Sequence, residues 1–342
     1  MRLPLSWLLA FTTAALALLL LGSLATGPMT LTLGESLRAL FAGQESGIES
    51  HKLLIVQEIR LPRTLLCIAV GGILGLCGAV MQGLFRNPLA DPGIIGVSGG
   101  AALGAALAIV LLTPLSQQLQ ATIGVGLLPL LAFLGGALTT TLVYLLGTRE
   151  GGTSVTVMLL AGVAITALSG AVIGLLTYLA DDQMLRNLSL WQMGTLAAGK
   201  PADVALALLT LAALLWLFMR DANPLNALLL GEGEARHLGV NVQSLKRRLI
   251  LLTAAGVGVA VAVSGMIGFV GLVVPHLVRL LAGPNHVRLL PLSALLGAAL
   301  LLAADMLART LLAPAELPVG IITALLGAPF FIWLLVKGRR AL

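Results

Sequence analysis

Residues 62–84 read PRTLLCIAVGGILGLCGAVMQGL, and no charged side chain stands between Arg63 and Arg86. An apolar run of roughly 20 residues is long enough for a helix to cross the hydrocarbon core of a bilayer. The glycines in the run suit helices packed in lipid, where small residues let neighbouring backbones approach closely. This stretch therefore predicts a membrane-spanning helix.

The rest of the chain has the same character. Of its 342 residues, 58% are hydrophobic and 10% are charged, and the mean hydropathy is +1.05. A soluble domain is roughly 45–50% apolar and about 25% charged, so a soluble core cannot hide this much apolar surface. We expect an all-α integral membrane protein with about ten transmembrane helices in a single domain over residues 1–342. The apolar runs predict spans near residues 5–27, 62–84, 93–112, 123–147, 153–180, 201–220, 244–264, 269–282, 289–308 and 318–336.

The basic residues indicate the orientation of these spans. With the N-terminus inside, about 13 of the 20 Lys and Arg residues fall in inner loops and tails, and such an excess marks the cytoplasmic side. We therefore expect both termini in the cytoplasm and the polar segment 28–57 on the outer face. The net charge of +6 is scattered between apolar runs, without the basic stripe interleaved with aromatic residues that indicates nucleic-acid binding.

The first apolar run, from Leu5 to Leu24, is longer than the ~7–15-residue core of a signal peptide. An uncleaved first span is therefore expected. Cys67 and Cys77 are ten residues apart in one run, about 15 Å along a helix, which is too far for a disulfide. We interpret both cysteines as packing residues.

The longest inner loop, residues 221–243, contains DANPLNALLLGEGEARHLGVNV. Asn223 and Pro224 indicate a helix start, and Gly231 and Gly233 stand around an acidic residue. The pattern predicts two short helices with a turn between them. Such a rigid cytoplasmic element suits docking to a soluble partner.

Two motifs that suggest catalysis lack the required context. GTLAAGK (194–200) fits a phosphate-binding loop, but Pro201 stands where Ser or Thr should hold Mg²⁺, and the predicted topology puts it outside the cell. We expect no nucleotide site on this chain, so that any ATP is hydrolysed by a partner. GVSGG (96–100) matches a nucleophile elbow without a preceding strand, and we interpret Gly96, Gly100 and Gly104 as a ladder for close helix packing.

The ionisable residues give no metal site. The four histidines, at 51, 237, 276 and 286, lack metal-ligand spacing, and His276 is interpreted as a hydrogen-bonded structural group. Asp305 is the deepest acid, and Arg309 follows one helical turn later on the same face. The two residues form either a pair that neutralises itself or a functional intramembrane pair, and both interpretations stay open.

Arg60 and Arg63 lie on either side of Pro62, at the outer end of the second span. Arginines that snorkel to the interface explain such positions, although more often on the cytoplasmic side. Together with Arg309, they are expected to form a basic ring on the outer face that docks an acidic partner.

At these residues the chain resembles the permease family that imports iron chelates, haem and cobalamin, of the vitamin B12 importer type. The resemblance covers nearly the whole chain and rests on seven motifs in the family's order. They are RLPR (60–63), GAVMQGLFRNPLADPGIIGVSGGAALGA (78–105), LLAGVAI (159–165), LLGEGEARHLGVNV (229–242), GMIGFVGLVVPHLVRLLAGPNH (265–286), ADMLAR (304–309) and ELPVGIITALLGAPFFIWLL (316–335).

The resemblance implies ten transmembrane helices, a homodimer with the pathway at its two-fold interface, two cytoplasmic ATP-binding-cassette ATPases that carry ATP and Mg²⁺, and a periplasmic binding protein. The chain itself would be no enzyme and would sit in the bacterial inner membrane, working by alternating access. Arg60, Arg63 and Arg309 match family arginines that meet glutamates of the binding protein. Thr153, Ser154 and Thr156 fall where the family forms its cytoplasmic gate. The coupling helices that contact the ATPase correspond to Glu232, Gly233, Glu234, Ala235, Arg236, His237, Leu238 and Gly239.

The segment DDQMLRNLSLWQMGTL (181–196) is most similar to the haem-importing branch, where Arg186 would meet a haem propionate through a charge-assisted hydrogen bond. Haem is therefore the expected cargo, with ferric siderophore and cobalamin as alternatives. An ion-gradient-driven secondary transporter is the alternative from another class, but it needs ion-binding acids or broken helices at mid-membrane, and Asp305 is the only candidate. A membrane scaffold or receptor that transports nothing is a third interpretation, which no sequence feature favours.

Overall fold

The computed structural model describes residues 4–41, 49–113, 115, 126–149, 152–197 and 199–339, and these residues are almost entirely helical. Within the described residues, seven helices are long and apolar enough to cross a membrane, and three shorter apolar segments accompany them: Val97–Val110, Val270–Ala282 and Val319–Leu334. The long helices are α1 (Leu5–Ala25), α4 (Leu61–Leu84), α7 (Leu127–Gly147), α8 (Val155–Leu179), α10 (Pro201–Arg220), α13 (Val242–Ser264) and α15 (His286–Thr310); the others are α5 (Val97–Val110), α14 (Val270–Ala282) and α16 (Val319–Arg339).

These ten helices coincide with the ten predicted spans, so the fold class is confirmed. The first residues of the predicted fourth span, 123–125, lie outside the described part of the chain. The predicted fifth span also began too early, because residues 152–153 form a strand and α8 begins only at Val155.

Short elements connect the spans. They are α2 (Leu33–Phe41), α3 (Ser50–Leu54), the π-helix η1 (Ile55–Arg60), the 3₁₀ turn η2 (Pro92–Ile95), α9 (Asp182–Gln192), α11 (Ala222–Leu229), α12 (Glu232–His237), β1 (Thr148–Arg149) and β2 (Gly152–Thr153). The two strands form an antiparallel hairpin in which Thr148 pairs with Thr153. The pair of short helices predicted in the inner loop is confirmed as α11 and α12.

The second span begins earlier than predicted. The helix runs without interruption from Ser50 to Leu84, through Pro62 near the start of α4. Proline inside a helix removes one hydrogen bond and collides with the carbonyl four residues earlier. Here the preceding turn, η1, is a π-helix, whose wider i→i+5 spacing places that carbonyl differently.

Helix α4 is the centre of the molecule. Buried residues make up 89% of its most apolar window, against 17% for α1 and for α8. Its glycines allow direct backbone contact, because a side chain at Gly71 or Gly75 would run into the backbone of α15, and one at Gly78 into Gly271 of α14. The surrounding helices turn apolar surfaces outward, as a lipid-facing perimeter requires.

The predicted packing ladder on α5 is confirmed at two of its three glycines. Side chains at Gly100 and Gly104 would meet backbone carbonyls of Gly135 and Leu131 on α7. Gly96 instead precedes α5 with a φ of 83°, and its carbonyl accepts a 2.9 Å hydrogen bond from Thr139 Oγ1. The 3₁₀ turn η2, and not a strand, precedes it, so this segment is no nucleophile elbow.

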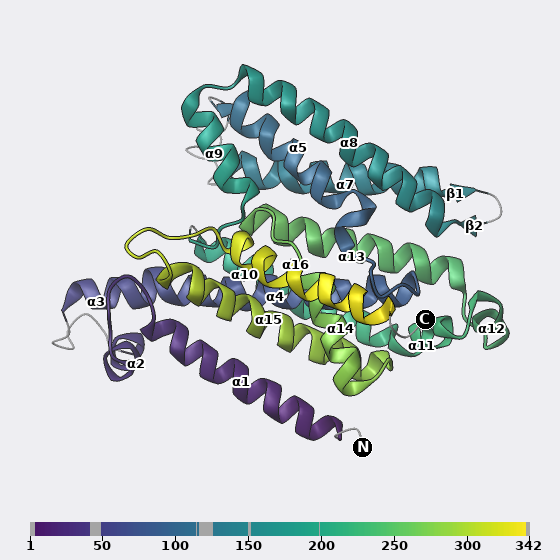
Figure 1. The fold of residues 1–342 in the computed structure, drawn as a ribbon, viewed down its shortest axis with the longest axis horizontal. Coiled ribbons are helices and arrows are strands. Elements are labelled where there is room, and N and C mark those ends of the chain that lie inside the picture. The colour runs from purple at the N-terminus through teal and green to yellow at the C-terminus, as the bar shows by residue number, and fades with distance from the viewer. Residues whose placement is uncertain are drawn as a thin grey trace.

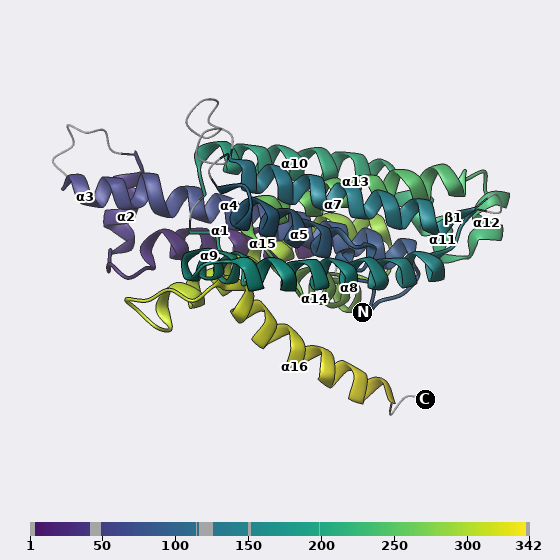
Figure 2. The ribbon, with the colours of Figure 1, turned by 90° about the horizontal axis from the view of Figure 1, so that it is seen from above.

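The helices run lengthwise between two ends of the molecule. Helices α11 and α12 and the β1–β2 hairpin lie at one end, and α2, α3 and α9 lie at the other (Figure 1). The start of α1 and the end of α16 point toward the end with α11 and α12. Helix α16 diverges from the bundle (Figure 2). We call the end with α12 the inner end and the opposite end the outer end, after the predicted orientation.

Candidate functional sites at the two ends of the bundle

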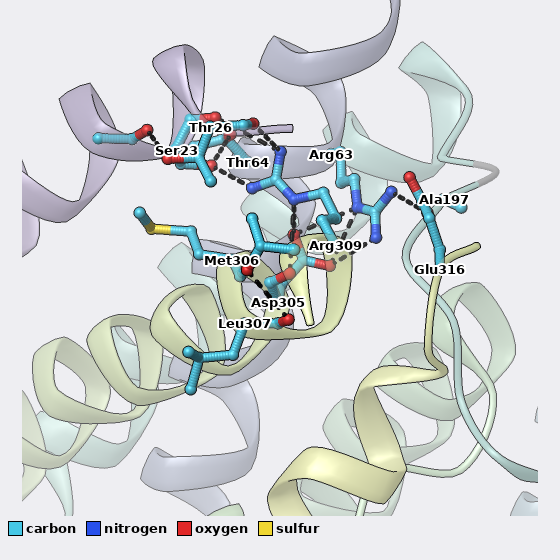
Figure 3. A network of polar contacts seen from close by, with 12 residues as sticks. Ser23, Thr26, Arg63, Thr64, Ala197, Asp305, Met306, Leu307, Arg309 and Glu316 are labelled. Carbon is cyan, nitrogen blue, oxygen red and sulfur yellow. Dashed lines mark hydrogen bonds and ion pairs between the residues drawn. The ribbon is translucent and has the colours of Figure 1, made fainter. Parts of the chain in front are cut away.

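The outer end contains a buried cluster of charges. Asp305, in the last turns of α15, is fully buried. Arg63, in the first turn of α4, approaches it with Nη2 at 2.9 Å and donates a 3.0 Å hydrogen bond from Nε. Arg309 Nε lies 3.0 Å from the other carboxylate oxygen. One carboxylate is thus shared by two guanidiniums (Figure 3).

Further groups complete this cluster. Arg63 Nη1 lies 2.7 Å from a carboxylate oxygen of Glu316, which belongs to the segment between α15 and α16. Arg309 Nη2 donates a 2.7 Å hydrogen bond to Ser23 Oγ of α1, and Ser23 lies 2.7 Å from Thr64 Oγ1. The cluster therefore joins α1, α4, α15 and the loop after α15 (Figure 3).

Arg60 holds the end of α1. Its Nη1 donates hydrogen bonds of 2.7 Å to the Leu24 carbonyl and 2.8 Å to the Ala25 carbonyl, and its Nη2 donates to the Met29 carbonyl. The last carbonyls of a helix lack intrahelical partners, and Arg60 supplies donors for them. Within the described part of the chain Arg60 has no acidic partner.

The three predicted docking arginines thus lie close together, but not as an exposed ring. Arg60, Arg63 and Arg309 are only 3%, 5% and 2% exposed. Partners within the protein satisfy these charges, as burial near the membrane requires. A cavity of about 230 Å³ still reaches all three arginines, together with Glu316. The docking role stays a prediction.

At the outer end, Glu35 and Lys52 form an ion pair that their spacing in the sequence did not predict. Partly buried Glu35, on α2, accepts a 2.8 Å hydrogen bond from the backbone N–H of Thr32, and its other oxygen lies 2.9 Å from Lys52 Nζ on α3. These two partners, Thr32 first and Lys52 second, lower the pKa of Glu35 to about 2. The contact fastens α2 to the start of the long second helix.

At the inner end, α12 presents an exposed face. Glu234, Arg236, His237 and Leu238 are exposed, Glu232 is partly buried, and only Ala235 is fully buried within the helix. Gly233 and Gly239 are also exposed, and Gly239 has a φ of 84°. The predicted coupling residues therefore form a helical knob with one anchoring alanine.

Helix α11 is bound to the start of α15. Asn226 Oδ1 accepts a 2.8 Å hydrogen bond from the backbone N–H of His286, and Asn226 Nδ2 donates a 3.0 Å hydrogen bond to Asn285 Oδ1. A cavity of about 450 Å³ adjoins both asparagines and Arg288. Sequence reasoning missed this contact, since Asn226 and His286 are sixty residues apart.

The predicted gate residues lie where the hairpin meets α8. Thr153 ends strand β2 and is 6% exposed. Ser154 is the N-cap of α8, and both Ser154 and Thr156 are exposed. Arg186 is exposed on α9, which lies at the outer end (Figure 1). The gate and cargo candidates therefore occupy opposite ends of the bundle.

The sequence matches the FecCD transport family over residues 15–337. The chain belongs to the FecCD transport family. It is 47% identical to the hemin transport system permease protein HmuU of Yersinia pestis, over 97% of this chain and 96% of that protein. It is 44% identical to the cobalamin import system permease protein BtuC of Halobacterium salinarum, over 87% and 77% of the two chains, and 41% identical to the vitamin B12 import system permease protein BtuC of Shigella boydii, over 98% and 96%.

A solved structure supports the same assignment. A protein described as a metal-chelate type ABC transporter in an inward-facing conformation superposes with a TM-score of 0.82 at 34% identity, over 98% of this chain and 100% of that one. The FecCD family relatives are permease subunits, so this chain is an importer permease and not an enzyme. The match covers every candidate site residue named above.

In this FecCD family permease, the loop-like motif at 194–200 has a packing role. The backbone N–H of Thr195 donates a 2.8 Å hydrogen bond to the Ser264 carbonyl, and a side chain at Gly194 would meet the Met266 backbone. Ala198 lies outside the described residues. Among its described atoms the motif makes helix-connecting contacts, and does not present a phosphate cradle.

His276 packs against an aromatic ring, and the two cysteines are buried. Neither ring nitrogen of His276 has a hydrogen-bond partner among the described residues, and the ring packs edge-on against Phe330 with centroids 6.2 Å apart. The expectation of a hydrogen-bonded His276 is therefore wrong. Cys67 and Cys77 are buried free thiols, as packing residues should be.

Proposed function

We propose that this permease moves haem (hemin) from a periplasmic binding protein into the cytoplasm by alternating access, as a homodimer powered by two cytoplasmic ATP-binding-cassette ATPases. The observation that supports haem as cargo is 47% identity to a hemin permease across almost the whole of both chains. The cobalamin permeases named above are 41–44% identical. Cobalamin and ferric siderophores are therefore the alternatives.

Arg186 is the proposed haem contact of the chain itself. It is exposed on α9, at the end where a binding protein would deliver its cargo. A guanidinium pairs well with a carboxylate such as a haem propionate. Lys keeps the positive charge of Arg but not its bidentate geometry, whereas Gln carries no charge. Arg186→Gln should therefore slow haem uptake more than Arg186→Lys.

Uptake into proteoliposomes tests the cargo. The permease is reconstituted with its ATPase, and ATP-dependent uptake is measured for hemin, a ferric siderophore and cobalamin, each with a cognate binding protein. Hemin uptake without the other two supports the proposal. Siderophore or cobalamin uptake without hemin uptake would show the cargo assignment to be wrong.

The driving force separates the importer from a secondary transporter. An ion-coupled carrier needs paired acids or broken helices at mid-membrane, whereas Asp305 is engaged by two arginines. Uptake in the presence of ATP should therefore survive a proton ionophore. Loss of uptake under the ionophore, with ATP unchanged, would favour the gradient-driven alternative.

The exposed face of α12 is proposed to contact the ATPase. Leu238 is 63% exposed, and a large apolar side chain on a cytoplasmic knob fits an apolar groove of a partner. Leu238→Asp should reduce ATPase binding without disturbing the fold, since the side chain packs against little of this chain. Unchanged ATPase binding and unchanged transport per ATP would contradict the coupling role of residues 232–239.

The second copy is proposed to pack against α8. Gly170 and Gly174 are exposed on that helix, and no atom of the described residues lies within 4 Å of a side-chain carbon built at either position. Small residues four apart allow close approach of another helix in lipid. Since no described helix of this chain fills that position, we propose that α8 of a second copy packs there.

The excess of basic residues at the inner end supports the proposed orientation. Helices α11 and α12 and both ends of the described chain lie toward one end (Figure 1), which is proposed to face the cytoplasm. Cysteine labelling from outside intact cells tests this assignment. A cysteine at position 234 should stay unlabelled, and labelling of that position would reverse the orientation.

A further inference from the structure

One lysine at the inner end is buried. Lys246 lies in the second turn of α13, and its side chain is 3% exposed. By its position in the sequence, Lys246 is one of the basic residues near the predicted inner ends of the spans, but its ammonium group contacts other residues of the protein. A buried ammonium is retained only where partners satisfy it, so its contacts identify what it holds together.

Lys246 contacts two elements that are far apart in the sequence. Its Nζ lies 2.6 Å from Glu232 Oε1, and Glu232 is the first residue of α12. The same Nζ donates a 3.2 Å hydrogen bond to the backbone carbonyl of Thr153, at the end of β2. One ammonium group thus bridges α12 and the hairpin.

A second residue of α13 fixes the hairpin in place. Gln243, one turn before Lys246, accepts hydrogen bonds from the Thr153 backbone N–H at 3.3 Å and from Thr153 Oγ1 at 3.1 Å. A side chain at Gly152 would collide with the Gln243 amide. The strand that leads into α8 therefore lies directly on the first turns of α13.

We propose that Lys246 is a positioning residue that couples α12 to the hairpin, so that α12, the first turns of α13 and residues 152–154 move as one unit. The inference rests on the proposed function, in which α12 contacts the ATPase and Thr153 and Ser154 belong to the cytoplasmic gate. A displacement of α12 is carried by the Glu232 contact to Lys246, and by Lys246 to the Thr153 carbonyl. The gate then follows the ATPase without any direct contact to it.

The substitutions separate this role from simple stability. Lys246→Met removes the ammonium and keeps the length of the side chain, and Lys246→Arg keeps the charge and its donors. Glu232→Gln weakens the α12 contact at a partly exposed position, where folding is less at risk. Arg247→Gln is the matched control, because Arg247 is the exposed neighbour on the same helix.

Transport per ATP hydrolysed is the first measurement, in proteoliposomes containing the permease, the ATPase and the binding protein. Lys246→Met and Glu232→Gln should lower this ratio by about 5- to 150-fold, the usual range of coupling between sites, while ATP hydrolysis continues. Lys246→Arg should restore most of it, and Arg247→Gln should equal the wild type. A role in stability alone would reduce assembled complex and hydrolysis together, leaving the ratio unchanged.

Labelling of the gate is the second measurement, and it does not depend on transport. Both native cysteines are buried, so Ser154→Cys introduces an exposed thiol for a maleimide probe. The labelling rate at position 154 should change when ATP binds the complex, and Lys246→Met should abolish that change. A normal ATP response in Lys246→Met, with an unchanged transport ratio, would overturn the inference. If the wild-type complex transports none of the three cargoes, the proposed function fails, while the labelling experiment still decides the role of Lys246.

Discussion

At the residue scale, Asp305 is the group at the outer end whose loss should cost the most stability. Its carboxylate is fully buried and compensates Arg63 and Arg309 together. Breaking a buried ion pair from one side costs more than the pair itself contributes, because the remaining charges stay buried without a partner. Asp305 neutralises Arg309 and also binds Arg63 of α4, and a functional role of the intramembrane pair stays a prediction.

Asp305→Asn should therefore destabilise the fold strongly, by about 3–5 kcal/mol. Thermal unfolding in detergent measures the loss. Glu316→Gln is the control, because a 34% exposed carboxylate contributes at most about 1 kcal/mol. Equal stability of the two variants would contradict the central role of Asp305.

Glu316 also competes with any partner that docks at the arginines. Its carboxylate occupies Arg63 Nη1 at 2.7 Å, beside the cavity that reaches Arg60 and Arg309. Glu316→Gln should tighten binding of an acidic binding protein by about 0.5–1 kcal/mol, roughly 2- to 5-fold, with a steeper salt dependence. Affinity measured at several salt concentrations tests this. Weaker binding in Glu316→Gln would mean that Glu316 itself contacts the partner.

At the element scale, the glycine contacts between α5 and α7 decide how closely these helices lie. Gly104→Ala should destabilise the fold by about 1–3 kcal/mol, since the added carbon meets the Leu131 carbonyl in a packed interface. Gly34→Ala in α2 is the control, because no described atom lies within 4 Å of the added carbon and alanine favours a helix over glycine. Thermal unfolding compares the two, and equal losses would contradict the packing argument.

The contact between Glu35 and Lys52, which attaches α2 to α3, should persist in mild acid. The pKa of Glu35 in the folded protein is about 2, against an ordinary value of 4.5. A lowered pKa contributes stability that is fully present above about pH 4.5 and is lost as the pH falls through about 2. Hydrogen exchange of α2 should thus stay constant from pH 7 to 5, after correction for intrinsic rates, and Glu35→Gln should already show faster exchange at pH 7. Identical protection in both proteins would exclude the contact.

The helices were predictable from the sequence because lipid demands long apolar runs, which ten segments supply. The contacts at their ends were not. Pro62 resembles a helix start, so the continuation of the second helix back to Ser50 was missed. The Arg63–Asp305 contact joins residues 242 positions apart, and Lys246 resembles an ordinary loop cation until its surroundings are known. The spacing of charges within one helix does not reveal their partners on another helix.

At the scale of the whole molecule, α8 is largely exposed, with 17% of its most apolar window buried, and it is the proposed dimer face. Gly170→Leu adds a side chain where the described residues leave open space, so the fold of one copy should be unaffected. The dimer should dissociate or weaken, because close helix approach in lipid depends on small residues. Cross-linking and mass measurement in detergent test the oligomeric state. A fully dimeric Gly170→Leu protein would move the interface away from this helix.

The contacts of the charge cluster at the outer end can form only in a fixed order while the chain is synthesised. Arg60 finds its acceptors on residues 24–29, which enter the membrane before it. Arg63 must wait for Asp305 and Glu316, which follow it by 242 and 253 residues. A nascent chain halted before residue 305 therefore carries a guanidinium at the membrane surface without its counter-charge. The Arg63 contacts form only after residues 305–316 have been synthesised, so chains truncated before residue 305 should remain open there and accessible to quality-control proteases.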